Sequence, residues 1–106
     1  MPTRTQIHFF GLFILIASLL TLSGCKKYGD VSPRAYEISK ALYSACNRKS
    51  TEHLEQSAEI VEESFEEGEI TESEQQWFRE IISKAEGGDW KQAMLDARSM
   101  MEDQQE

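Results

Sequence analysis

Few side chains in this 106-residue chain could do covalent chemistry. Cys25 and Cys46 are the only cysteines, and His53 is the only histidine after residue 24. Cys46 and His53 make a formal nucleophile–base pair, but Cys46 falls on an apolar helix face and no glycine-rich loop offers an oxyanion hole. Gly87-Gly88 is not followed by Lys-Ser or Lys-Thr, as a phosphate-binding loop would be. We therefore predict no catalytic residue, no metal site, no small-molecule substrate and no enzyme.

Cys25 ends a segment that is typical of exported proteins. The run Phe9–Leu22 contains 14 residues without a charge, whereas a membrane-spanning helix needs about 20 apolar residues. Arg4 precedes this run in a short polar region, and the small residues Ser23 and Gly24 follow it. This order matches a secretory signal peptide, which has a charged start, an apolar middle and small residues at its cleavage site. An ordinary signal peptide that happens to contain a cysteine is one interpretation.

The residues at Cys25 support a more specific interpretation. Leu22-Ser23-Gly24-Cys25 resembles the lipobox of bacterial lipoproteins. The resemblance implies that residues 1–24 are a cleaved signal peptide, that the cut falls between Gly24 and Cys25, and that Cys25 carries diacylglycerol and an N-acyl chain. Several acyl chains would anchor the protein, since each buried CH₂ contributes about 0.8 kcal/mol and a single chain binds only reversibly. In this family an Asp after the cysteine resembles an inner-membrane retention signal, so Lys26 favours the periplasmic face of the outer membrane.

Removal of residues 1–24 would leave 82 residues, enough for one small domain. We assign residues 25–32 to the lipidated cysteine and a short tether, 33–103 to a helical domain, and 104–106 to a frayed tail. The seven tether residues after Cys25 span at most about 25 Å, so the domain should lie close to the bilayer. No cofactor beyond the covalent lipid is expected.

Cys46 has no partner for an intramolecular disulfide if Cys25 is lipidated. In an oxidising compartment it is either buried as a small apolar side chain or available for an intermolecular disulfide. Burial is favoured, because free cysteine is among the most buried residue types.

Acidic residues dominate the middle of the chain. Ten carboxylates fall between Glu52 and Glu74, and no Lys or Arg occurs between Lys49 and Arg79. Loss of the signal peptide would change the formal net charge from −8 to −9, because its one charged residue is an arginine; this argues against nucleic acid as a partner. The acidic surface is a docking face for a basic protein, a loose binder of divalent cations, or a solvated face that keeps the domain soluble. Its candidate interaction residues are Glu59, Glu62, Glu63, Glu66 and Glu67.

Part of a calcium-binding EF-hand pattern lies within this acidic region. Gly68, Ile70 and Glu74 have the spacing of loop positions 6, 8 and 12, and helices are expected on both sides. Phe65 stands at position 3, where the pattern requires an oxygen ligand such as Asp or Asn. A helix that ends at Gly68, followed by an N-terminal capping box from Thr71 to Glu74, explains the same residues without a metal, and we favour that interpretation.

Apolar spacing predicts an all-α fold without strands. We expect helices from Ser32-Pro33 to 47–49, from Ser50 or Thr51 to Gly68, from Thr71 to Gly87, and from Asp89 to 102, on the basis of their capping residues. Each helix carries an apolar seam with a spacing of three or four residues. The seams are Ile38, Ala41, Leu42 and Ala45; Leu54, Ala58, Val61 and Phe65; Trp77, Phe78, Ile81, Ile82 and Ala85; and Trp90, Ala93, Met94, Ala97, Met100 and Met101. Short turns between them predict a small antiparallel bundle of three to four short helices.

The last part of the chain is similar to a tetratricopeptide helical hairpin. Trp77, Gly88-Asp89-Trp90 and Ala93 fall where that hairpin places a Trp, its turn and a small packing residue. Glu80 and Lys84 depart from the pattern, and no 34-residue repeat is present in the rest of the chain. The resemblance implies a tight helical hairpin and, more faintly, a peptide-binding groove. Trp77 and Trp90 are therefore candidate interaction residues, with packing in the core as the alternative.

These observations together favour a binding role. We expect a membrane-anchored accessory or scaffold module in the bacterial cell envelope, held by its lipid and bound to a protein partner that completes its sparse core. The alternative is a stand-alone structural or stress-type lipoprotein that forms homodimers, with an intermolecular disulfide at Cys46 as one route.

Overall fold

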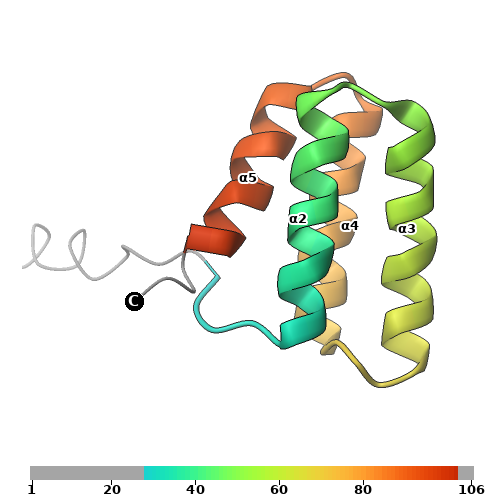
Figure 1. Ribbon diagram of the computed structural model, residues 1–106, viewed down its shortest axis with the longest axis vertical. Helices are drawn as coiled ribbons and strands as arrows, with labels where there is room; N and C mark the ends of the chain where they lie inside the picture. The colour runs from blue at the N-terminus through green and yellow to red at the C-terminus, as the bar shows by residue number, and fades with distance from the viewer. Residues whose placement is uncertain (1–27, 103–106) are drawn as a thin grey trace, which may run out of the picture.

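The computed structural model describes residues 28–102, which form four α-helices (Figure 1). With the labels of Figure 1, these are α2 (Pro33–Asn47), α3 (Thr51–Glu66), α4 (Glu72–Glu86) and α5 (Trp90–Glu102). Residues 28–102 contain no strand, so the prediction of an all-α fold is confirmed. The predicted signal peptide, the lipidation site at Cys25 and the tail 104–106 lie outside the described residues.

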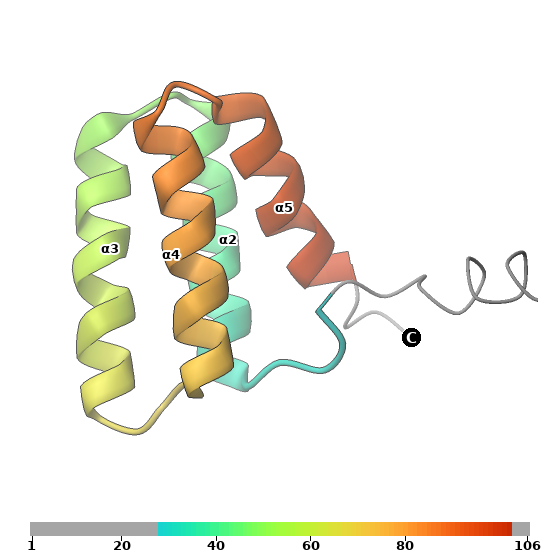
Figure 2. The ribbon, with the colours of Figure 1, turned by 180° about the vertical axis from the view of Figure 1, so that it is seen from behind.

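The helices form a small antiparallel bundle. α3 and α5 each pack against both α2 and α4, on opposite sides, whereas α2 and α4 contact each other only slightly (Figures 1 and 2). The axis of α5 is tilted away from the common direction of the other three helices (Figure 1). Among residues 28–102, no helix has the length and apolar character that crossing a bilayer requires.

Apolar residues from all four helices meet in one core. Its largest fully buried side chains are Leu42, Val61, Phe78, Ile81 and Met100. Complete burial of a side chain of this size contributes about 1.5–3 kcal/mol relative to an exposed one. The predicted seams of α4 and α5 therefore face the core, with Trp77, Trp90 and Met94 packed at its edge.

Two of the predicted seams are partly wrong. On α3, Phe65 is 37% exposed, whereas Ser57 and Ser64 are buried beside Leu54 and Val61. Small serines allow close helix packing on this face, and the Ser64 hydroxyl accepts a hydrogen bond from Arg34 Nε of α2 at 3.1 Å. On α2, Ala41 is exposed. In the last turn of α3 it is therefore Ser64, and not Phe65, that faces the rest of the bundle.

The segment that leads into α2 packs on the bundle. Tyr28 is 9% exposed, and its ring lies edge-on to the Trp77 ring of α4, with centroids 5.2 Å apart. Val31 packs against the core as well. Tyr28 and Val31, which the sequence assigns to the tether, therefore pack on the bundle.

Glu74 joins this segment to the bundle. Its carboxylate is almost fully buried and accepts hydrogen bonds from the Ser32 backbone N–H at 2.7 Å, the Ser32 hydroxyl at 2.9 Å and the Thr71 backbone N–H at 2.8 Å. The Thr71 hydroxyl accepts in turn from the Glu74 N–H, which completes the predicted capping box of α4. Ser32 is also the N-cap of α2 and accepts from the Ala35 N–H. One carboxylate thus links the N-termini of two helices.

Helices α2, α3 and α4 each end in the same type of C-terminal turn. The residues that follow the C-caps have positive φ values, 52° at Lys49, 75° at Gly68 and 91° at Gly88. In each turn the next N–H reaches back to a carbonyl in the last turn of the helix, as for Glu69 to Ser64 at 2.9 Å. This is the Schellman motif, which favours glycine because a left-handed residue with a Cβ is strained.

Replacement of Gly68 tests this turn. Gly68→Ala should lower the free energy of unfolding by about 1 kcal/mol, because φ stays left-handed while a Cβ is added. Gly87→Ala is the matched control, since Gly87 has φ −77° and a Cβ there would make ordinary contacts; its stability should stay equal or rise. Urea denaturation of the two variants measures both, and equal effects would contradict the assignment.

Replacement of Glu74 tests the link between the two helix N-termini. Glu74→Gln should lower the free energy of unfolding by about 1–3 kcal/mol, because the new NH₂ group faces N–H or O–H donors and leaves a buried donor unsatisfied. Glu72→Gln in the same turn, which is exposed, should change it by no more than about 0.5 kcal/mol. Similar unfolding curves for the two variants would show that the buried carboxylate does not hold the helix ends.

Candidate functional site

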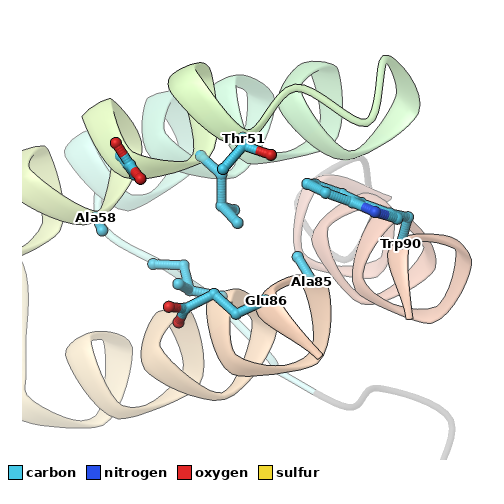
Figure 3. Close-up of a pocket in the computed structure, with 8 residues that line it drawn as sticks. Thr51, Ala58, Ala85, Glu86 and Trp90 are labelled. Atoms are coloured by element: carbon cyan, nitrogen blue, oxygen red, sulfur yellow. The ribbon is translucent and has the colours of Figure 1, made fainter. Parts of the chain in front are cut away.

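An apolar groove lies between α3 and α4 on the described part of the surface. Its volume is about 290 Å³. It is lined by Thr51, Leu54, Glu55, Ala58, Ile82, Ala85, Glu86 and Trp90. Ala58 and Trp90 lie at opposite ends of it, and the Trp90 indole extends over one end towards Thr51 (Figure 3). We call this feature the α3–α4 groove.

Helical spacing places these residues along one line on each helix. Thr51, Glu55 and Ala58 fall on the side of α3 that faces α4, and Ile82 and Glu86 fall on the facing side of α4. Trp90, the first residue of α5, comes directly after the Gly87–Asp89 turn and borders the end of the groove.

The groove combines an apolar floor with an acidic rim. Leu54, Ile82 and Ala85 are buried, whereas Glu55 and Glu86 are exposed at the edges of the two helices. No Lys or Arg is among the lining residues. This arrangement suits a ligand that presents apolar groups beside positive charges. It offers no nucleophile–base pair at the groove, and residues 28–102 contain no cluster of three metal-binding side chains.

An ion pair bridges the two helices next to the groove. Arg79 of α4 binds Glu62 of α3 through two nitrogens, with Nε 3.2 Å from Oε2, and Gln75 donates to Oε1 at 3.0 Å. The hydrogen bond from Arg79 lowers the pKa of the Glu62 carboxyl below its ordinary value, and the same bond raises the pKa of the Arg79 guanidinium. Arg79 therefore neutralises one of the predicted docking carboxylates.

The other predicted acidic residues do not converge on a site. Glu59, Glu63 and Glu66 are exposed along α3, and Glu67 forms the C-cap of that helix. A hydrogen bond to Glu67 raises the pKa of Glu69. Glu55 and Glu86, which line the groove, were not among the predicted interaction residues. Charge pattern alone could not select them, because the groove is defined by how α3 pairs with α4.

The two tryptophans occupy different places. Trp90 borders the α3–α4 groove, whereas Trp77 lies against Tyr28 and beside a second depression of about 280 Å³ lined by Glu72, Ser73 and Gln76. Both side chains are partly buried against the core. The structure therefore confirms the antiparallel pairing of α4 and α5 but does not bring Trp77 and Trp90 into one binding surface.

Cys46 is buried in the core, whereas His53 lies at the surface. Cys46 is 2% exposed, and burial raises the pKa of its thiol. His53 is exposed, and its Nδ1 lies 2.6 Å from the hydroxyl of Ser50, the N-cap of α3. An intermolecular disulfide at Cys46 would therefore require local opening of α2. The prediction of a buried cysteine is confirmed.

The residues of the EF-hand pattern have structural roles. Glu74, which stands at the place of the bidentate calcium ligand, is engaged by Ser32 and Thr71. Ile70 is buried in the core, and Gly68 ends α3. These roles match the capping interpretation of the same residues.

A buried aspartate on α5 has no counterpart in the sequence prediction. Asp96 is 3% exposed, its Oδ2 binds Lys84 Nζ of α4, and its Oδ1 accepts from Gln92 Nε2 at 3.0 Å. The contact fixes the flank of α4 that faces α5. Asp96 comes three residues after Ala93 and four before Met100, so helical spacing places it at the edge of the apolar face and could have indicated its burial.

Comparisons with known proteins assign no family to this chain. No protein-family model matches it, and neither a curated protein nor a solved structure matches it significantly.

The reactivity of Cys46 tests its burial. In the folded, detergent-solubilised protein the thiol should react with a chromogenic disulfide reagent about 100-fold more slowly than in urea, because reaction requires opening of the helix end. Cys46→Ser identifies the part of the signal that comes from this residue. A thiol that reacts equally fast in both states would place Cys46 at the surface and would support the alternative of a homodimer linked by a disulfide at Cys46.

Proposed function

We propose that the protein is a lipid-anchored accessory module of the bacterial cell envelope, and that it acts by binding another protein through the α3–α4 groove. The observation that carries this proposal is the position of the groove. The chain that comes from Cys25 joins the helices at Ser32, and the groove lies near the opposite end of the bundle.

Distances along α4 support this arrangement. Glu74, which binds Ser32, is in the first turn of α4, and Glu86, which lines the groove, is in its last turn. These two residues are about 18 Å apart along the helix axis at 1.5 Å per residue. Tyr28 and Trp77 also lie on another flank of α4, because Lys84 on that side binds α5 whereas Arg79 on the groove side binds α3. A membrane anchor at Cys25 would leave the groove open.

The short link to Cys25 would keep the bundle at the bilayer. Three peptide units separate Cys25 from Tyr28, which is a reach of about 11 Å at full extension. Lys26 and Lys27 fall in this link and would lie beside the lipid headgroups, where a basic residue gains about 1 kcal/mol on an anionic surface. Lys26, in the place of an inner-membrane Asp, is the reason to propose the periplasmic face of the outer membrane.

A binding role fits the groove better than a catalytic role. The lining residues comprise apolar side chains, one threonine and two carboxylates. Glu55 and Glu86 are exposed on separate helices and neither pairs with a nucleophile, so the groove offers recognition of charge and apolar shape rather than proton transfer.

Crosslinking in intact cells tests the proposal. The tagged protein should be recovered with membranes and should yield one reproducible partner by mass spectrometry after chemical crosslinking. Cys25→Ser should abolish membrane recovery and reduce the crosslink strongly, because the lipid holds the groove near its partner. Membrane association that survives Cys25→Ser, or crosslinks only between copies of this chain, would contradict the proposed function.

A further inference from the structure

We infer that the α3–α4 groove binds an amphipathic helix of a partner protein, one that carries two bulky apolar side chains on one face and Lys or Arg beside them. This inference rests on the proposed binding function and adds the chemistry of the partner. It follows from the size of the groove, the charges at its rim and the kind of backbone it can accept.

The size of the groove sets the number of anchoring side chains. A protein cavity of about 150 Å³ accommodates one benzene molecule, so a groove of about 290 Å³ accommodates two side chains of the size of Leu or Phe. Leu54 and Ile82 provide the apolar floor, and Trp90 provides an aromatic wall at one end (Figure 3). Trp side chains are frequent anchors of protein interfaces because they offer a large apolar surface with one polar group.

The charges select a basic partner. Glu55 and Glu86 stand on opposite helices at the rim, and Glu52 and Glu59 continue the negative charge along the exposed side of α3. Arg48 and Lys49 of the turn after α2, and Lys91 of the first turn of α5, lie at this end but do not line the groove. An anionic group in the groove would be repelled by both rim carboxylates. Lys or Arg on either side of an apolar anchor would be attracted by them.

The backbone of the partner must satisfy its own hydrogen bonds. A peptide in extended conformation gains affinity by adding a strand to a sheet edge, and residues 28–102 contain no strand. A helix pairs its own N–H and C=O groups and can insert side chains at positions i, i+3 or i+4, and i+7 between two neighbouring helices. The space between α3 and α4 suits that mode of binding.

Fluorine NMR with a defined peptide tests this inference. The lipidated protein, labelled with 5-fluorotryptophan and held in phosphatidylcholine nanodiscs, is titrated with a synthetic helix that has Leu on one face, Lys beside it and no Trp. We expect the Trp90 resonance to shift until saturation and the Trp77 resonance to stay unchanged, because Trp77 lies on another flank of α4. The same peptide with Glu in place of Lys should bind at least about tenfold more weakly.

Matched variants locate the binding site. Ala58→Phe fills the groove and should abolish the shift, whereas Ala41→Phe adds the same ring at an exposed site of α2 and should leave the shift intact. Glu55→Lys combined with Glu86→Lys should weaken binding at least tenfold. Glu80→Lys combined with Glu63→Lys changes the net charge equally at exposed sites outside the groove and should not.

Several outcomes would overturn the inference. These are an unchanged Trp90 resonance, equal binding of the Lys and Glu peptides, binding that survives Ala58→Phe, and a Trp90 shift that depends on protein concentration without peptide. If one of them occurs while crosslinking in cells still yields a partner at another face, the proposed function stands and the groove chemistry is wrong. Peptide binding without any partner in cells would support the groove chemistry and count against the proposed function.

Discussion

The buried carboxylate of Glu74 is the contact on which the geometry of this protein depends. It accepts hydrogen bonds from Ser32 and Thr71, the N-caps of α2 and α4, and so fixes the start of both helices relative to each other. Tyr28 is held four residues before Ser32 by its ring contact with Trp77. Together these contacts turn most of the predicted tether into part of the folded body. The direction in which the chain enters the bundle is therefore set by the fold.

The same geometry separates the segment that enters the bundle from the candidate binding site. α4 carries both, because its first turns hold the entering chain and its last turn borders the groove. Trp77 and Lys84 lie on the side of α4 that contacts Tyr28 and α5. Arg79 and Ile82 lie on the side that contacts α3. A helix of 15 residues can present two independent surfaces in this way, since successive side chains project at intervals of about 100°.

Local signals predicted most of the fold, and contacts between helices explain where prediction failed. Ser32, Thr71 with Glu74, and Gly68 act through their immediate neighbours, so capping rules placed the helix ends correctly. Phe65 was placed in the core because apolar spacing does not show which side of the last turn of α3 faces the bundle, and the structure buries Ser64 there. The groove was missed for a related reason: its lining combines residues of α3, α4 and α5, and the pairing of these helices is a tertiary property. The proposed lipidation of Cys25 and the proposed protein partner are tested in cells.

The most direct test of the binding role is site-specific photocrosslinking in intact cells. A photoreactive amino acid at position 51 lies at the exposed rim of the groove, and the same amino acid at position 44 lies on an exposed part of α2. The expected result is an adduct with one protein from position 51, lost when Glu55→Lys and Glu86→Lys are added, and no such adduct from position 44. Equal adducts from both positions, or none from position 51, would contradict the assignment of the α3–α4 groove as the binding site.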